Sequence, residues 1–360
     1  MSTQAHAETI KPARRPRPIS SLVVPTVGLT LVAAVVAWLA VNLVKDWSTF
    51  LQLSFSGLTR GSTYALVALG YTLVYGILEL INFAHGDVFM IGGMIAASFA
   101  IGVFALGSNP SLTSLLPAIL VSLAVAMIAC GLLNAGIERV AYKRLRGAPR
   151  LVPLITAVGV AFIIEDAAFI WKGPDPVSLP PEILPNDAIF TLGACPKCSA
   201  YRWDQLFVLL VTIPVLLGLM WLVRYTRRGK AMRATAQDKD AAAMMGIDVD
   251  RTISFTFLVA GALAGAAGVT FTLYGTTIQF NTGFTLGLIA FTAAVLGGIG
   301  NLPGAVLGGL LIGFIQDYNE GLSWHAPGSA WTNSIVFGIL ILILVFRPQG
   351  LLGEQTPEGG

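Results

Sequence analysis

Blocks of about twenty apolar residues alternate with short polar stretches along most of the chain. An α-helix of about twenty residues spans the roughly 30 Å hydrocarbon core of a bilayer, so each block predicts a membrane helix. The blocks are residues 20–44, 57–77, 88–105, 115–137, 151–171, 205–223, 252–274, 284–299, 305–316 and 332–346. This pattern predicts an all-α, polytopic integral membrane protein with about ten transmembrane or partly re-entrant helices.

The composition agrees with this class of protein. Hydrophobic residues make up 55% of the 360 positions and charged residues only 11%, whereas soluble domains carry about a quarter charged residues. The net charge of +3 comes from short basic clusters between the apolar blocks. Such clusters act as topology signals, so we expect contact with membrane lipid and no nucleic-acid partner.

The basic clusters also predict the orientation of the chain. If the blocks cross the membrane alternately, residues 1–19, 138–150 and 224–251 fall on one face. The proline-rich loop 172–204 and residues 317–325 fall on the other face. Basic loops remain in the cytoplasm, so both termini are expected there and loop 172–204 is expected in the periplasm.

The domain organisation follows from these segments. Residues 1–19 are basic and proline-rich, and we expect them to be a disordered cytoplasmic N-terminus. Residues 20–44 read as an additional transmembrane helix, because the apolar run is too long for a cleaved signal peptide. Residues 50–353 then form the main transmembrane domain, and residues 354–360 form a C-terminal tail.

Two polar breaks interrupt the apolar pattern. One reads Asn-Phe-Ala-His-Gly-Asp at residues 82–87, and the other reads Gly-Asn-Leu-Pro-Gly at residues 300–304. Polar groups and non-helical backbone are tolerated at membrane depth only inside protein or beside water. We expect paired helix breaks near the inner end of a path, although a signature turn used for packing is the alternative. The candidate path residues are Asn82, His85, Gly86, Asn301 and Gly304.

Small and charged residues inside the blocks carry further expectations. Gly261, Gly265 and Gly268 share one helical face, which favours close packing of helix backbones. Arg60 is expected to extend its side chain to the interface. Glu165-Asp166 is expected at the rim of its span rather than in a buried proton relay.

The basic stretch 227–251 contains a short helix signal. Asp238 is a capping residue for a helix over residues 239–245, and Gly246 suits the left-handed position that ends it. Such a helix presents small residues and the flexible pair Met244-Met245. These features suit docking on another protein; the alternative is a solvated loop that only fixes orientation.

No enzyme constellation emerges from the sequence. His6, His85 and His325 are scattered, and no phosphate-binding G-x-x-x-x-G-K-[ST] loop is present, so we expect neither metal nor cofactor in this chain. Cys195 and Cys198 lie in the loop 172–204, where a local disulfide is favoured over a redox pair or half of a zinc site.

Several motifs occur in a characteristic order. They are Gly-Leu-Thr-Arg-Gly-Ser-Thr-Tyr-Ala-Leu at 57–66, Tyr-Gly-Ile-Leu-Glu-Leu-Ile-Asn-Phe-Ala-His-Gly-Asp at 75–87, Arg-Ala-Thr-Ala-Gln-Asp at 233–238, Ala-Phe-Thr-Ala-Ala-Val-Leu-Gly-Gly-Ile-Gly-Asn-Leu-Pro-Gly-Ala at 290–305 and Arg-Pro-Gln-Gly-Leu-Leu-Gly at 347–353. In these motifs the chain resembles the permease subunits of bacterial branched-chain amino acid ABC transporters. It is most similar to the first of the two homologous permeases of the high-affinity system.

The resemblance implies an importer of the bacterial inner membrane. Its parts would be this chain, a second homologous permease, two cytoplasmic ATPases that bind ATP and Mg, and a periplasmic substrate-binding protein. The chain itself would not be an enzyme. Within residues 225–251, the resemblance implies a coupling region that contacts an ATPase, and the candidate coupling residues are Arg233, Asp238, Ala242, Met244, Met245 and Gly246.

The resemblance leaves the cargo open. Branched-chain or related amino acids are the first expectation, and urea or short amides are the alternative. An ion-coupled secondary transporter or a channel is the rival class, and a membrane scaffold is disfavoured by the polar breaks. Four features depart from the family pattern: the added segment 20–44, Glu165-Asp166, Ile289 at a position where lysine is common, and the loop that contains Cys195.

Overall fold

The computed structural model describes residues 20–108, 110–149, 151–180, 183–185, 187–192, 199–347 and 349–353. The chain divides into two compact units, residues 1–47 and 48–360. In the first unit, α1 (Ser20–Lys45) is a single helix of 26 residues, which agrees with a helix over residues 20–44.

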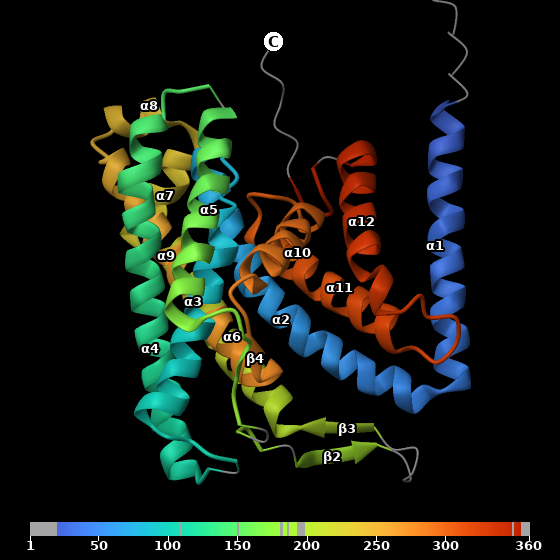
Figure 1. Ribbon diagram of the computed structural model, residues 1–360. Helices are drawn as coiled ribbons and strands as arrows, with labels where there is room; N and C mark the ends of the chain where they lie inside the picture. Colours follow the sequence, from blue (N-terminus) through green and yellow to red (C-terminus); the bar gives the residue numbers. More distant parts are fainter. Residues whose placement is uncertain are drawn as a thin grey trace, which may run out of the picture. The chain divides into compact units, whose positions relative to one another are not determined.

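The second unit is built from helices (Figure 1). These are α2 (Trp47–Leu78), α3 (Ala84–Ser98), α4 (Leu112–Ile137), α5 (Leu151–Lys172), α6 (Trp203–Tyr225), α7 (Arg227–Gln237), α8 (Lys239–Met244), α9 (Val249–Gly275), α10 (Thr282–Gly297), α11 (Leu302–Gly321) and α12 (Thr332–Phe346). Short π-helical or 3₁₀ turns are η1 (Phe99–Val103), η2 (Glu138–Tyr142), η3 (Lys143–Leu145) and η4 (Ser329–Trp331).

The predicted all-α membrane class is confirmed. Among the described residues, seven helices are long and apolar enough to cross a membrane. The expected number of about ten is approximate, because α10 has only 16 residues and α11 is not among those seven.

Four short strands occur in the described part of the chain. They are β1 (Val177–Ser178), β2 (Ala188–Leu192), β3 (Ser199–Arg202) and β4 (Thr277–Ile278). β1 pairs antiparallel with β4, and β2 pairs antiparallel with β3. Three of them lie in the loop 172–204, where the residue pattern carried no strand signal.

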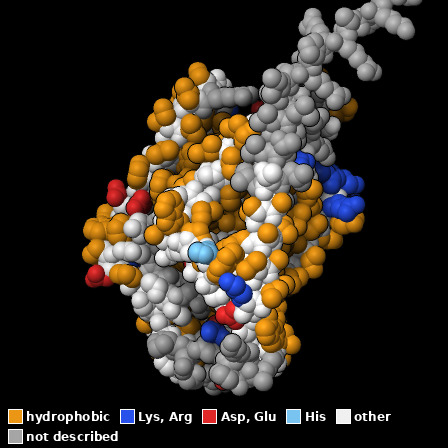
Figure 2. Space-filling view, turned by 90° about the vertical axis from the view of Figure 1, so that its right-hand side faces the viewer, with side chains coloured by type: hydrophobic (Ala, Val, Ile, Leu, Met, Phe, Trp, Pro, Cys, Tyr) orange, Lys and Arg blue, Asp and Glu red, His pale blue; other side chains and the backbone are white. Residues whose placement is uncertain are grey.

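The core of the second unit forms around α3, α4 and α9. α3 packs against α4, α5, α9 and α10, and α9 also packs along α4 (Figure 1). The apolar stretch of α2 is 89% buried, whereas that of α12 is only 11% buried. The exposed faces of α4, α5, α6 and α12 are mostly apolar, and Figure 2 shows hydrophobic side chains over much of one face of the molecule. Such surfaces suit lipid or a partner membrane protein.

A glycine face brings α9 against its neighbours, as predicted. A Cβ atom added to Gly261 or Gly265 would lie 2.3 Å or 2.5 Å from a backbone oxygen of α4. One added to Gly268 would lie 2.3 Å from the backbone oxygen of Phe89 on α3. Only glycine lets these backbones approach so closely. Cys130 is buried at the same contact and donates a hydrogen bond to a carbonyl of α3 at 3.3 Å.

Gly265→Ala is therefore expected to lower the stability of the folded chain by about 1–3 kcal/mol, the usual cost of overpacking a close contact. The higher helix propensity of alanine, worth about 1 kcal/mol, opposes this loss. Gly136→Ala on α4 is the matched control, because no atom lies within 4 Å of its added Cβ. Thermal unfolding of the purified protein in detergent compares the two variants, and an equal or higher stability for Gly265→Ala would contradict the packing.

Candidate functional site

The first predicted break separates α2 from α3 at residues 79–83. The phenolic O–H of Tyr142 donates to Asn82 Oδ1 at 2.8 Å. Asn82 Nδ2 contacts Asn134 Oδ1 at 3.4 Å, and Asn134 Nδ2 donates to the carbonyl of Phe257 at 2.7 Å. All three polar side chains are buried. The break is thus hydrogen-bonded to η2, α4 and α9 inside the chain.

His85 and Gly86 pack at the start of α3. The His85 ring is buried and lies edge-on to the ring of Tyr71, with 4.8 Å between the centroids. A Cβ atom added to Gly70 would lie 2.2 Å from His85 Nε2, and one added to Gly86 would lie 2.4 Å from the carbonyl oxygen of Gly283 on α10. These contacts fix the crossing of α2, α3 and α10.

A group of carboxylates lies where α3, α5 and α10 meet. Asp87 is fully buried, and within the described part of the protein neither of its carboxylate oxygens has a hydrogen-bond partner. Glu165 on α5 is close enough to interact with it electrostatically. Glu165 is half-buried and Asp166 is exposed, and Glu165 lies about 10 Å along the helix from the end of α5. The sequence did not link this pair to Asp87.

The second predicted break separates α10 from α11. Gly298 and Gly300 have φ angles of +107° and +95°, which glycine adopts without a steric penalty. Asn301 caps α11 by accepting the N–H of Gly304 at 3.1 Å. Its Nδ2 donates to the carbonyl of Leu352 at 2.7 Å. The five candidate path residues therefore lie at two helix breaks, and each break is held by packing and hydrogen bonds within the chain.

The predicted coupling region, residues 225–251, contains the helix expected from its capping signals. The Asp238 carboxylate accepts two backbone N–H groups of α8, both at 2.9 Å. Gly246 has a φ of +81°. The N–H groups of Gly246 and Ile247 donate to the carbonyls of Ala243 and Ala242 at 3.0 Å and 3.1 Å, which closes the helix with a Schellman motif. The predicted N-cap at Asp238 and the predicted helix end at Gly246 are both confirmed.

The side chains of this region divide into buried and exposed sets. Ala242 is buried, whereas Met244 and Met245 are 82% and 85% exposed. Arg233 on α7 donates to the carbonyl of Arg224 at 3.2 Å, and so caps the last turn of α6. The helix α8 is therefore capped at both ends, and the side chains of Met244 and Met245 at its C-terminal end are exposed.

A cluster of ion pairs holds the start of α9 against η2 and η3. Glu138 is fully buried, binds the guanidinium of Arg146 and accepts the Ser254 hydroxyl at 2.6 Å. Arg146 also binds Asp250, which pairs with Lys143 at 2.8 Å. We call these five residues the α9 clamp. Sequence reasoning missed it, because the partners lie about a hundred residues apart and their only signal was charge near the helix ends.

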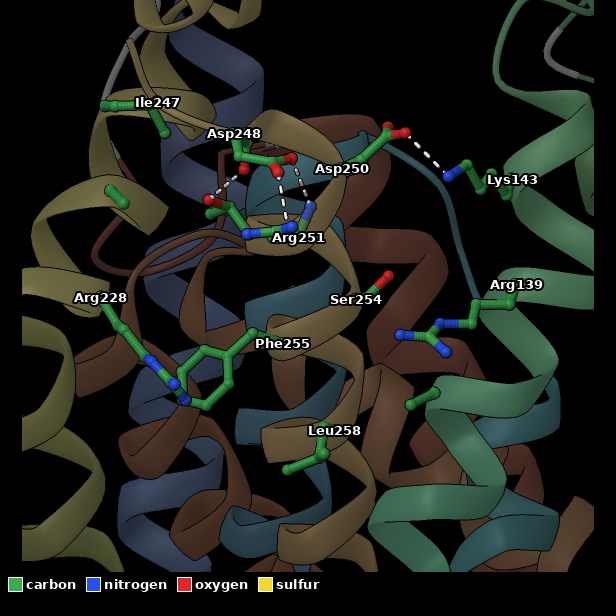
Figure 3. A pocket seen from close by; sticks show the side chains of 13 residues that line it. Arg139, Lys143, Arg228, Ile247, Asp248, Asp250, Arg251, Ser254, Phe255 and Leu258 are labelled. Carbon is green, nitrogen blue, oxygen red and sulfur yellow. Dashed lines mark hydrogen bonds and ion pairs between the residues drawn. The ribbon is translucent and has the colours of Figure 1, made fainter.

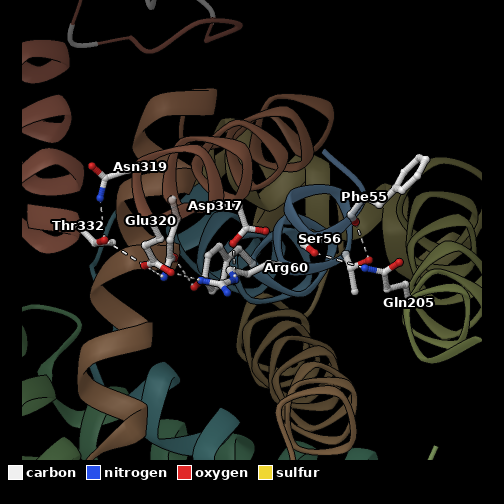
Figure 4. A network of polar contacts seen from close by, with 11 residues as sticks. Phe55, Ser56, Arg60, Gln205, Asp317, Asn319, Glu320 and Thr332 are labelled. Carbon is white, nitrogen blue, oxygen red and sulfur yellow. Dashed lines mark hydrogen bonds and ion pairs between the residues drawn. The ribbon is translucent and has the colours of Figure 1, made fainter. Parts of the chain in front are cut away.

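A second polar network joins α2, α11 and α12 (Figure 4). Arg60 Nε lies 3.0 Å from Asp317 Oδ1, and Arg60 Nη1 lies 3.1 Å from Glu320 Oε2. The hydroxyl of Thr332 donates to Glu320 Oε1 at 3.0 Å. Arg60 was expected to extend to the interface by itself; it pairs with two carboxylates of α11 instead.

Some expectations fall on residues that the structure does not describe. Cys195 and Cys198 lie outside the described residues, as do the segments 1–19 and 354–360. Among the described residues, no group of three or more His, Cys, Asp or Glu side chains could hold a metal ion.

Comparisons with known proteins agree in pointing to one family. Residues 53–345 match the family model described as the branched-chain amino acid transport system / permease component. The chain is 39% identical over 311 residues to the high-affinity branched-chain amino acid transport system permease protein BraD of Pseudomonas aeruginosa, which covers 86% of this chain and 97% of BraD. It is 38% identical over 310 residues to the permease LivH of Escherichia coli, with the same coverage.

A more distant relative is the probable branched-chain amino acid transport permease LivH of Methanocaldococcus jannaschii, which is 26% identical over 298 residues. The 298 aligned residues cover 80% of this chain and 88% of the relative. No solved structure matches the chain. The family model spans most of the chain, and it includes both helix breaks, the predicted coupling region and the α9 clamp. The chain therefore belongs to the permease components of branched-chain amino acid ABC transport systems.

Proposed function

We propose that this chain forms, with a second homologous permease, the membrane path for branched-chain or related amino acids in an ATP-driven importer. The family assigns the chain a permease role rather than an enzymatic one. The substrate class follows the names of the relatives, which are branched-chain amino acid permeases. Two cytoplasmic ATPases would hold ATP and Mg, and a periplasmic protein would deliver the substrate.

The observation that carries this proposal is the exposed methionine pair on α8. A stand-alone carrier has no need for a short helix that is capped at both ends and presents Met244 and Met245 to its surroundings. Flexible apolar side chains of this kind suit a groove on a partner. We assign α8 and the adjoining Arg233 to the ATPase contact. The basic segments, and hence both termini, then lie in the cytoplasm of an inner-membrane protein.

A continuous set of contacts supports transmission from α8 to the first break. α8 leads directly into α9, whose first turns carry Asp250 and Ser254 of the clamp. The clamp joins α9 to Glu138 in η2, and Tyr142 at the end of η2 donates to Asn82. Movement of α8 on an ATPase would therefore reach the backbone between α2 and α3. We propose that Asn82, His85 and Gly86, with Asn301 and Gly304, hold the breaks beside the path.

The face of α5 that carries Glu165 and Asp166 is our candidate for the path wall. A carboxylate that faces lipid costs up to about 2.5–3.5 kcal/mol at the centre of a membrane helix, and Glu165 lies about 10 Å from the end of α5. Contact with the second permease and with water removes that cost. The oxygens of Glu165 and Asp166 would accept hydrogen bonds from the ammonium group of an amino acid.

The test is ATP-dependent uptake by the complete importer in liposomes. Leucine, isoleucine or valine should accumulate only when the binding protein is present and ATP is supplied on the side that exposes α8. Vesicles with both permeases but no ATPase should show no flux. Substrate flux in those vesicles would overturn the importer in favour of a carrier or channel. Accumulation of urea or acetamide, with no uptake of the three amino acids, would show that the substrate is urea or a short amide.

A further inference from the structure

A cavity of about 890 Å³ opens between η2, α7 and the first turns of α9 (Figure 3). Neither the helix breaks nor the exposed methionines of α8 contribute to it. We propose that this cavity binds the phosphodiester headgroup of an anionic phospholipid. The proposal concerns the leaflet on the side of α8, and it rests on the proposed function only in calling that leaflet cytoplasmic.

The walls of the cavity carry unbalanced positive charge. Within the lining, Lys143 is paired with Asp250 at 2.8 Å and Arg251 with Asp248 at 3.0 Å. Arg139 and Arg228 lie on opposite walls (Figure 3), and neither forms an ion pair with another described residue.

Each of the two arginines can face a phosphate. The guanidinium of Arg228 stacks over the ring of Phe255, with 4.5 Å to the ring centroid, and this fixes its position while leaving N–H groups free to donate. Arg139 extends from η2 toward the same space (Figure 3). Guanidinium groups bind phosphate oxygens through paired N–H donors. The Ser254 side chain lies between the two walls.

The floor of the cavity is apolar and lies within the membrane helices. Ala135, Phe255 and Leu258 line it. Leu258 lies nine residues after the start of α9, or about 14 Å along the helix. Leu132, three residues before Ala135 on α4, presents an exposed apolar side chain. This surface would accept the first part of an acyl chain.

Neighbouring aromatic residues place the rim at headgroup level. Trp221 and Tyr225 are exposed in the last turns of α6, directly before α7. Tryptophan and tyrosine concentrate at the membrane–water interface. A cationic rim at this level above an apolar floor matches one amphipathic anion, and basic pockets between membrane helices on the cytoplasmic side bind such lipids. An acidic surface of a soluble partner would not fill the floor.

The test measures lipid retention by the purified full-length chain, without transport. The chain is placed in nanodiscs of phosphatidylcholine with a minority of phosphatidylglycerol, and the lipids that remain bound are quantified by native mass spectrometry. Arg139→Gln and Arg228→Gln should each weaken phosphatidylglycerol binding about fivefold, the change expected for one basic side chain at an anionic surface. Arg144→Gln and Arg227→Gln are matched controls, because both residues are exposed in the same stretches and do not line the cavity.

Additional variants and competitors distinguish lipid binding from misfolding and from binding of a free anion. Arg139→Lys keeps the positive charge but loses the paired N–H donors, so it should bind phosphatidylglycerol more tightly than Arg139→Gln and less tightly than the unchanged chain. This order of affinities is expected for a phosphate contact and not for a loss of the fold. Inorganic phosphate at millimolar concentration should not displace the lipid. Displacement would show that the cavity binds a free anion, and it would overturn the proposal of a lipid site. Equal phosphatidylglycerol retention in all variants would also overturn the proposal. None of these readouts depends on the substrate.

Discussion

Replacing Met244 and Met245 together by aspartate is expected to abolish substrate-stimulated ATP hydrolysis in the reconstituted importer. Both side chains are more than four-fifths exposed, so the change should alter the free energy of unfolding by no more than about 0.5 kcal/mol. In an apolar groove on the ATPase, however, the two carboxylates would be desolvated without partners. Loss of one interface anchor costs about 2 kcal/mol or more, and the double change should exceed that.

The measurement is the ATPase rate of the complex with and without loaded binding protein. Gly147→Asp is the matched control, because it adds a carboxylate at an exposed position outside residues 225–251, where no atom lies within 4 Å of an added Cβ. Gly246→Pro should reproduce the loss by another route, since proline cannot adopt the φ of +81° that closes α8. Normal stimulation in the methionine variant would contradict the ATPase contact.

Arg146→Gln is expected to destabilise the folded chain by about 3–5 kcal/mol, the usual cost of removing one partner of a buried ion pair. Glu138 has no exposed surface. Without Arg146 its charge would be balanced only by the hydroxyl of Ser254. The clamp would also lose the contact between Arg146 and Asp250 at the start of α9.

Thermal unfolding of the detergent-purified protein measures this effect. Adding Glu138→Gln to Arg146→Gln should recover part of the stability, because the neutral amide still accepts the Ser254 hydroxyl and no bare charge remains. Arg144→Gln, at an exposed position of the same turn, should leave the unfolding temperature unchanged. Equal stability of Arg146→Gln and Arg144→Gln would show that the clamp contributes nothing.

Local signals in the sequence predicted much of this architecture. The cap at Asp238, the stop at Gly246 and the break before Asn301 depend on residues within one or two turns, where side-chain chemistry sets the backbone directly. The glycine face of α9 was readable for a similar reason, since spacing alone brings Gly261, Gly265 and Gly268 to one side. For these elements the prediction and the structure agree.

Partners distant in the sequence could not be predicted in the same way. Tyr142 and Asn82 are separated by 60 positions, and Arg60 and Glu320 by 260. The sequence marked Asn82 as a polar group that requires a partner or water in a membrane, and it predicted that Arg60 extends to the interface. Neither signal names the partner, because the choice of partner depends on how the helices pack. The strands β2 and β3 were missed because their segment lacks the alternating pattern of a half-buried strand.

The elbow between α10 and α11 is completed by residues made later in synthesis. The N–H groups of Leu351 and Leu352 donate to the carbonyls of Leu296 and Gly297 at 2.8 Å and 3.0 Å, and Asn301 donates to Leu352, 51 positions further along the chain. While the ribosome is still making α12, these backbone carbonyls lack their final partners. The turn between α10 and α11 can therefore reach its final hydrogen bonding only after α12 and the segment 350–353 have been synthesised. Correct folding of this turn is thus one of the last steps in the biogenesis of the permease.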